Sequence, residues 1–252
     1  MVNKGGHIFF TQRVNCPACN HKDSSEIIVL EWENKILKNL FKKRKYSLDF
    51  FKEGKYVLLE CGKCSLIYQE YCPTDELQDE MYNKWLKRYT SDDLHNYRFN
   101  PYSAKKTIYN ISEINQLINI FSKKPTNCKI LDFGMGWGGF VQAARLMGFE
   151  AYGVELSNDK VQYNRSNGLK IISWEEISSY SFDFINVQQV FEHVDKPFQI
   201  LKYLLGGLAD KGFMKISVPD ASNIKSNLKK KFKSEWFYAK GKRYSLNPVE
   251  PL

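Results

Sequence analysis

Residues 130–140, ILDFGMGWGGF, decide the fold of this chain. An apolar run ends in closely spaced glycines, and a helical pattern begins directly after them at Gly139. A strand that turns through glycines into a helix is the nucleotide-binding arrangement at the carboxyl end of the first strand of an open sheet. The glycines let the backbone approach a ligand closely. This stretch therefore predicts a ligand site at the edge of a parallel sheet.

Strand and helix patterns alternate through the rest of this region. The expected strands are 129–133, 151–154, 169–172, 182–187 and 213–218, and the expected helices are 139–147, 159–167 and 197–205. Alternation of this kind predicts an α/β fold with a doubly wound parallel sheet.

The glycines admit two classes of cofactor. Gly134, Gly136 and Gly139 satisfy G-x-G-x-x-G, the spacing of dinucleotide-binding loops, so NAD has to be considered. Asp132 argues against it, because a carboxylate there would repel the pyrophosphate that such folds bind at the helix N-terminus. The same carboxylate suits a cation, and S-adenosylmethionine (SAM) carries an ammonium and a sulfonium. We therefore expect SAM.

Further candidate cofactor contacts follow the other strands. Glu155 ends the second strand, 21 residues after Gly134, where an acidic side chain can accept hydrogen bonds from both ribose hydroxyls. Trp174 follows the third strand and lines an adenine pocket in one interpretation and packs in the core in the other. Gln188 is placed to contact the methionine part of the cofactor.

Four of the six cysteines form two pairs, Cys16 with Cys19 and Cys61 with Cys64. Two C-x2-C turns can bring four thiolates to one ion, and disulfides are rare in a reducing compartment. The pattern predicts a structural zinc site, with a rubredoxin-like iron site or four reduced core thiols as alternatives. The 41 residues between the pairs exceed the usual interval, so we expect a helical insertion at about 31–45.

Three segments are expected on this basis. Residues 1–72 form a small zinc-ribbon-like domain, residues 73–126 a helical linker or cap, and residues 127–252 the SAM-binding core. The linker shows helical spacing of apolar residues at 75–89 and 102–121.

Composition excludes some classes of protein and leaves others open. The formal net charge is +9, but the excess is concentrated in 225–243, so a solvated face is favoured over a nucleic-acid patch. An RNA-directed methyltransferase or RNA-binding module using that segment is the alternative function. No apolar run is long enough to span a membrane, and the N-terminus lacks a signal-peptide pattern, so we expect a cytoplasmic protein.

Over residues 127–220 the chain resembles class I SAM-dependent methyltransferases. The resemblance rests on Asp132-x-Gly134-x-Gly136-x-Gly138, on Glu155, and on FDFINVQQVFEHV at residues 182–194. Together with the paired cysteines, the chain is similar to the zinc-containing branch that includes deoxysugar C-methyltransferases. The resemblance implies methyl transfer to a small-molecule acceptor such as a nucleotide-linked sugar.

The resemblance also implies which residues react. It places Glu192 and His193 at the reaction centre, and more loosely Tyr89, for which Tyr82 competes. Histidine titrates near neutral pH, so His193 suits a general base that Glu192 orients. The alternative is that the pair simply begins the next helix.

The chain departs from that family at its end. The family's fold has seven strands, and only 34 residues follow Val218, without a visible strand pair. We therefore expect the last two strands to be lacking and the fifth strand to be exposed. A truncated relative that binds the cofactor without transferring a methyl group is the remaining alternative.

Overall fold

The computed structural model describes residues 9–44, 46–52, 54–81, 84, 102–121, 123–218 and 224–225. These residues fall into two compact units. The first holds the described residues of 1–86, 191–198 and 218–252, and the second those of 87–190 and 199–217.

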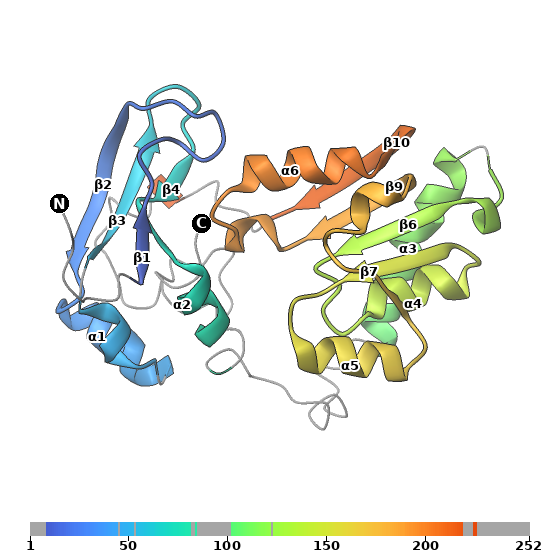
Figure 1. The fold of residues 1–252 in the computed structure, drawn as a ribbon, viewed down its shortest axis with the longest axis horizontal. Coiled ribbons are helices and arrows are strands. Elements are labelled where there is room, and N and C mark those ends of the chain that lie inside the picture. The colour runs from blue at the N-terminus through green and yellow to red at the C-terminus, as the bar shows by residue number, and fades with distance from the viewer. Residues whose placement is uncertain are drawn as a thin grey trace. The chain divides into compact units, whose positions relative to one another are not determined.

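The second unit is built on a five-stranded sheet (Figure 1). Its strands are β6 (Lys129–Phe133), β7 (Glu150–Val154), β8 (Lys170–Ile171), β9 (Phe182–Gln188) and β10 (Leu208–Ser217). All neighbouring pairs are parallel, and the spatial order is β10-β9-β6-β7-β8. The order reverses at β6, so the predicted doubly wound parallel sheet is confirmed, and the glycine stretch leaves the sheet at its switch point.

Helices cover both faces of this sheet. They are α3 (Ala104–Ile120), α4 (Gly139–Leu146), α5 (Asn158–Ser166) and α6 (Pro197–Gly206). Helix α6 lies on one side of the sheet and α4 and α5 on the other (Figure 1). Right-handed crossovers between parallel strands need such helices, and they bury both faces of the sheet.

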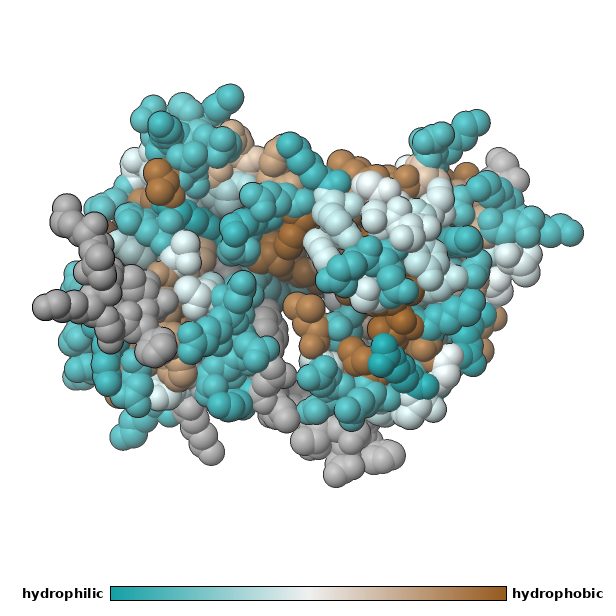
Figure 2. All heavy atoms as spheres, in the orientation of Figure 1, coloured by the Kyte–Doolittle hydropathy of each residue, from teal (hydrophilic) through white to brown (hydrophobic). Residues whose placement is uncertain are grey.

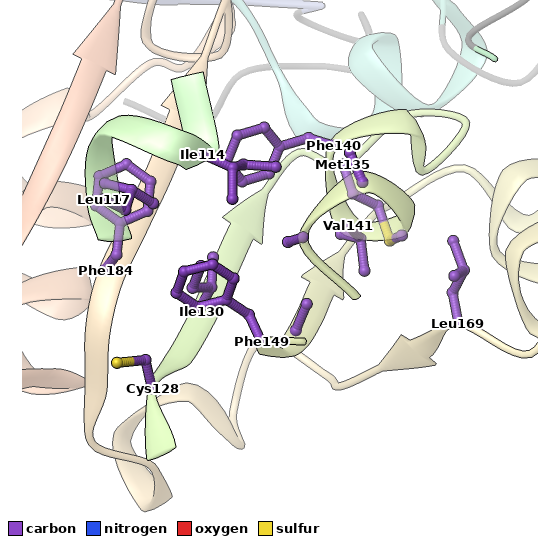
Figure 3. Packing of buried hydrophobic residues seen from close by; sticks show 13 residues of the cluster. Ile114, Leu117, Cys128, Ile130, Met135, Phe140, Val141, Phe149, Leu169 and Phe184 are labelled. Atoms are coloured by element: carbon purple, nitrogen blue, oxygen red, sulfur yellow. The ribbon is translucent and has the colours of Figure 1, made fainter. Parts of the chain in front are cut away.

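Aliphatic and aromatic side chains fill the space under α3 and α4 (Figure 3). Ile114 and Leu117 of α3 lie in one buried cluster with Phe140 of α4, Ile130 of β6 and Phe184 of β9. This packing fixes the first strand and the helix that follows the glycines, so the turn between them is held at both ends.

The first unit contains two small antiparallel sheets. Strands β2 (Ser24–Glu31), β3 (Lys55–Cys61) and β4 (Ile67–Gln69) form one, and β1 (Phe10–Gln12) and β5 (Tyr71–Pro73) form the other. Helix α1 (Lys35–Arg44) lies between β2 and β3 in the chain, within the interval that separates the two cysteine pairs. Cys61 is the last residue of β3, and Cys16 lies in the turn that follows β1.

An aromatic core holds the insertion in place. Leu37, Leu40 and Phe41 of α1 are fully buried, and the ring of Phe41 stacks on Phe51 at a centroid distance of 4.0 Å. Trp32 meets the Phe51 ring edge-on at 5.2 Å. The insertion therefore packs into a hydrophobic core that it shares with β1, β3 and α2 (Asp75–Glu80), and a second buried cluster contains Cys16 and Cys61.

Helix α2 (Asp75–Glu80) opens the linker, and the hydroxyl of Thr74 caps it by accepting a hydrogen bond from the N–H of Leu77. The helix expected at 75–89 is present over these residues. Residues 85–101, which include Tyr89, lie outside the described part of the chain.

Hydrophilic side chains predominate on the face drawn in Figure 2. Among the described residues, no helix combines the length and the apolar character needed to cross a membrane.

Candidate cofactor and metal sites

The glycine loop adopts a backbone that only glycine takes without strain. Gly134, Gly136 and Gly138 have φ angles of 78°, 55° and 79°. The N–H of Gly134 donates to the carbonyl of Val154 in β7 at 2.9 Å, which ties the loop to the neighbouring strand. Gly138 is the N-cap of α4, so the loop leads directly into the helix.

The three glycines face different surroundings. A Cβ at Gly134 would lie 2.5 Å from Val190, and one at Gly138 would lie 2.4 Å from the side-chain oxygen of Asn164. A Cβ at Gly136 would meet no atom within 4 Å. The outer glycines are therefore required by packing within the chain, and the middle one borders open space that a ligand can approach.

Glu155 lies beside that open space. Its Oε2 accepts a hydrogen bond from the N–H of Gly136 at 2.8 Å, and its Oε1 accepts from Leu156 at 3.1 Å and Ser157 at 2.9 Å. Lys160 lies 3.8 Å from Oε1. Since each carboxylate oxygen can accept about two hydrogen bonds, Oε2 retains capacity for a hydroxyl.

Asp132 is buried at the end of β6, with 5% of its surface exposed. The side-chain amide of Asn186, opposite it in β9, donates to Asp132 Oδ1 at 2.8 Å. Burial raises the pKa of Asp132 to about 7, although the Asn186 hydrogen bond acts in the other direction. This carboxyl group therefore changes charge near neutral pH.

A polar row continues across the sheet from Asp132. Lys215 in β10 lies opposite Asn186, and its ammonium is 2.5 Å from Glu113 of α3. The positive charge of Lys215 stabilises the Asp132 carboxylate, and the Glu113 charge opposes it.

Trp174 and Gln188 flank the same end of the sheet. The half-buried Trp174 ring stacks on Tyr203 of α6 at 4.3 Å and lies 5.2 Å from the ring of Phe133. The hydroxyl of Tyr203 donates to the Trp174 carbonyl at 2.8 Å. Gln188 is the last residue of β9 and is half-buried.

Glu192 and His193 belong to the first unit and form part of a single 3-10 turn, Phe191–His193, that follows β9 in the chain. His193 Nε2 lies 3.8 Å from Glu192 Oε1, and the Glu192 side chain is 11% exposed. Among the residues described, the predicted pair is therefore together, whereas Tyr89 lies outside them.

The four paired cysteines converge. The Sγ atoms of Cys16, Cys19, Cys61 and Cys64 all lie within 4.8 Å of one another. Cys16 and Cys64 are 3.6 Å apart, and Cys19 and Cys61 are 3.5 Å apart. Four sulfurs around a zinc ion at about 2.3 Å would be separated by about 3.8 Å, so the set fits one tetrahedral ion.

The two cysteine turns have the same backbone hydrogen bonds. In the first, Cys16 donates to the carbonyl of His21 at 2.8 Å and accepts from Asn20 at 2.9 Å. In the second, Cys61 donates to Leu66 at 2.9 Å and accepts from Ser65 at 3.0 Å.

The residue after each second cysteine also has a positive φ, 58° at Asn20 and 59° at Ser65. Two unrelated stretches therefore adopt one geometry.

Backbone N–H groups favour a thiolate in the second turn. The N–H of Cys64 lies 3.5 Å and that of Lys63 3.4 Å from the sulfur of Cys61. These bonds, the Cys64 one first, lower the pKa of Cys61 to about 6. Burial raises the pKa of Cys16. A cation among the four sulfurs would favour the thiolate at every position.

A family model described as a methyltransferase domain matches residues 76–246. The chain belongs to this family. In this methyltransferase-domain protein, the glycine loop follows β6, where the strand order of the sheet reverses. No curated protein sequence was found to match the chain.

Several solved structures are similar to the chain at low sequence identity. A SAM-dependent methyltransferase from Archaeoglobus fulgidus is 19% identical, with a TM-score of 0.36 over 45% of this chain and 53% of that one. Plantazolicin methyltransferase BpumL, in complex with SAH (S-adenosylhomocysteine), is 22% identical, with a TM-score of 0.47 over 64% and 65%.

Coclaurine N-methyltransferase, bound to N-methylheliamine and SAH, is 14% identical, with a TM-score of 0.43 over 54% and 45%. The methyltransferase-domain protein thus spans less than two thirds of each of these chains.

Sequence patterns missed two residues of the loop region. Asn164 of α5 is fully buried, and its amide donates to the carbonyl of Gly136 at 2.8 Å. Gln189, directly after β9, has a φ of 56°, which is unusual for a residue other than glycine. Only Asn164 carried a signal, because asparagine is a poor residue for a helix interior unless its side chain has a partner.

Proposed function

We propose that this chain is a SAM-dependent methyltransferase that acts on a small-molecule acceptor. The observation that carries the proposal is the open side of the loop at Gly136, with the carboxyl groups of Asp132 and Glu155 at the ends of the two strands that flank it. SAM is a cation that contains a ribose. Asp132 would meet its positive charge, and Glu155 would meet its ribose hydroxyls.

The residues present fit this cofactor. Gly134, Gly136 and Gly138 would let its methionine and ribose portions lie against the backbone, and Glu155 would accept the ribose hydroxyls. Asp132 would attract the ammonium. Trp174 would line the adenine pocket with the face not covered by Tyr203, and Gln188 would meet the methionine part.

His193 is proposed as the general base. Bound SAM supplies a methyl group that its sulfonium has already activated. The imidazole of His193 would accept the proton of the acceptor's nucleophilic atom, and Glu192, 3.8 Å away, would orient the ring and stabilise its charged form. Tyr89 is proposed at the same centre on the family resemblance alone.

The proposed acceptor is a nucleotide-linked sugar or another glycan or metabolite precursor. This rests on the resemblance to the branch that pairs a cysteine domain with a Glu-His pair. The four thiols are proposed to hold a structural zinc ion, because four protein ligands leave no position open for substrate. Thiolate ligands stay reduced in the cytoplasm, where we place the protein.

Calorimetric titration with SAH, with NADH as the parallel titration, tests the cofactor class. Micromolar binding of SAH alone is the expected result, and Gly136→Val should abolish it because the new side chain fills the open side of the loop. Binding of NADH alone would show that the role of Asp132 is misassigned. Absence of SAH binding by folded protein would contradict the proposal.

Incubation with SAM and a panel of nucleotide sugars, followed by measurement of SAH formation, tests the reaction. His193→Ala is expected to lower turnover by about a hundredfold or more while leaving SAH affinity within about twofold. His21→Gln is the matched control, because it removes a histidine of the same unit that has no proposed part in the reaction. Unchanged turnover in His193→Ala would exclude this residue as the base.

A further inference from the structure

The segment that carries Glu192 and His193 belongs to the same compact unit as the four paired cysteines. Residues 191–198 belong to the first compact unit, together with the described residues of 1–86. This segment follows directly from β9, which belongs to the second unit. The residues of the first unit that bind it therefore restrain the backbone next to the proposed base.

Arg13 is the residue that binds it. Its Nη2 donates to the carbonyls of Val194 at 3.2 Å and Asp195 at 2.9 Å, and its Nη1 donates to the carbonyl of Gln69 at 3.2 Å. One guanidinium thus joins the segment to strand β4. The backbone of Arg13 is itself held, because its N–H donates to the carbonyl of Glu70 at 2.7 Å.

The two carbonyls that Arg13 binds lie next to the proposed general base in the chain. Val194 and Asp195 directly follow the 3-10 turn of Phe191–His193, so their carbonyls lie just after the end of that turn. A cation that binds both carbonyls restrains the backbone on the C-terminal side of His193. The flat fork of arginine reaches three acceptors at once, which the single ammonium of lysine does not do in the same geometry.

We propose that Arg13 is a positioning residue for the reaction: it holds the Glu192-His193 turn through the carbonyls of Val194 and Asp195. The inference rests on the proposed function, because the turn has a chemical role only if His193 is the base. Arg13 lies three residues before Cys16, the first of the paired cysteines. On this proposal, the unit that contains the cysteines also positions the general base. Arginine is used here in a chain whose basic residues are mostly lysine.

The test compares Arg13→Lys and Arg13→Ala with Lys22→Ala, which removes an exposed cation of the same unit. The imidazole NMR signal of His193 in the full chain, assigned with His193→Gln, should shift or broaden in both Arg13 variants and stay unchanged in Lys22→Ala. With an acceptor found in the sugar screen, kcat should fall about tenfold in Arg13→Lys, with the KM for SAM within about twofold.

Metal content and SAH affinity separate positioning from folding. Both should match wild type in Arg13→Lys, and the smaller disturbance in Arg13→Lys keeps the test valid if Arg13→Ala does not fold. An unchanged His193 signal in folded variants, or a loss of SAH affinity or metal equal to the loss of turnover, would overturn the inference. Failure of the wild-type chain to bind SAH or to transfer a methyl group would contradict the proposed function instead, and the NMR comparison would still report on Arg13.

Discussion

The two candidate sites are built in different ways. In the cysteine site, each turn is closed by backbone hydrogen bonds within six consecutive residues, and both turns have the same pattern. In the glycine loop, the contacts come from far along the chain: Glu155, Asn164 and Val190 all touch it. The geometry of the cysteine turns is local and is the same in both C-x2-C stretches. The geometry of the glycine loop depends on the assembled sheet.

This difference predicts how each site fails. Losing one thiolate should prevent the proposed ion from joining the two cysteine turns. Altering the glycine loop should change cofactor affinity or packing by an amount that depends on which neighbour is disturbed. The following variants measure the difference, from the largest expected effect to the smallest.

Cys16→Ser should release the bound metal and unfold the first unit. Structural zinc contributes about 10 kcal/mol to small domains, and one lost ligand removes most of that contribution. Elemental analysis and thermal unfolding are the measurements. Cys72→Ala, which alters a buried thiol of the same unit outside the cluster, is the control and should keep its metal. A wild-type chain purified without metal would refute the zinc proposal. A coloured protein that contains iron would show that the metal is iron and not zinc.

Gly138→Ala and Gly136→Ala form a matched pair in the loop. Gly138→Ala should lower the free energy of unfolding by about 2–4 kcal/mol, because the methyl group meets Asn164 and Leu169 and the backbone has a positive φ. Gly136→Ala should cost only about 1 kcal/mol in stability, yet weaken SAH binding more than about tenfold. Denaturant unfolding and calorimetry distinguish the two. Equal effects in both measurements would mean that the loop is not open at Gly136.

The affinity for SAH should fall as the pH is lowered through 7. The pKa of Asp132 is raised to about 7 by burial, so below that pH the carboxyl becomes neutral and no longer attracts the ammonium. The dissociation constant should then rise about tenfold per pH unit. Calorimetry at pH 6 and pH 8 measures this, with Asp132→Asn as a weak-binding control that shows no such slope.

The stability contribution of Asp132 should change in the opposite direction. Its folded pKa lies above its unfolded value, so its contribution is present at low pH and is lost as the pH rises toward 7. Unfolding of wild type and Asp132→Asn across this range separates the two effects. A binding slope that persists in Asp132→Asn would assign the titration to another group.

Asn164→Ala should give the smallest effect. It removes one buried hydrogen bond to the carbonyl of Gly136, worth about 1 kcal/mol, and should weaken SAH binding about fivefold. Asn158→Ala, at an exposed position of the same helix, should change nothing measurable. If both variants bind SAH like wild type, the long-range contact does not hold the loop in its binding geometry.

The strands were predictable because their signals are local. Apolar runs bounded by turn residues gave all five strands of the parallel sheet, and the cysteine spacing gave the four thiols that converge. Helix α3 shows the limit of this approach. Its apolar residues repeat at helical spacing, yet Ile114 and Leu117 are buried while Ile108 is 67% exposed. Periodicity identifies the face of a helix, and the partner that covers it decides how much of that face is buried.

The sequence alone determined the strands of the parallel sheet, the cofactor class expected from Asp132 and Glu155, and the pairing of the cysteines in two C-x2-C turns. Only the tertiary structure decided that Gly136 is the open glycine, that Asn164 holds the loop, and that Arg13 binds the carbonyls after His193. The physical reason is separation along the chain. Backbone turns and periodic burial depend on residues that are close in the sequence. The hydrogen bond from Arg13 to the carbonyl of Val194 joins residues 181 positions apart, so no local sequence pattern predicts it.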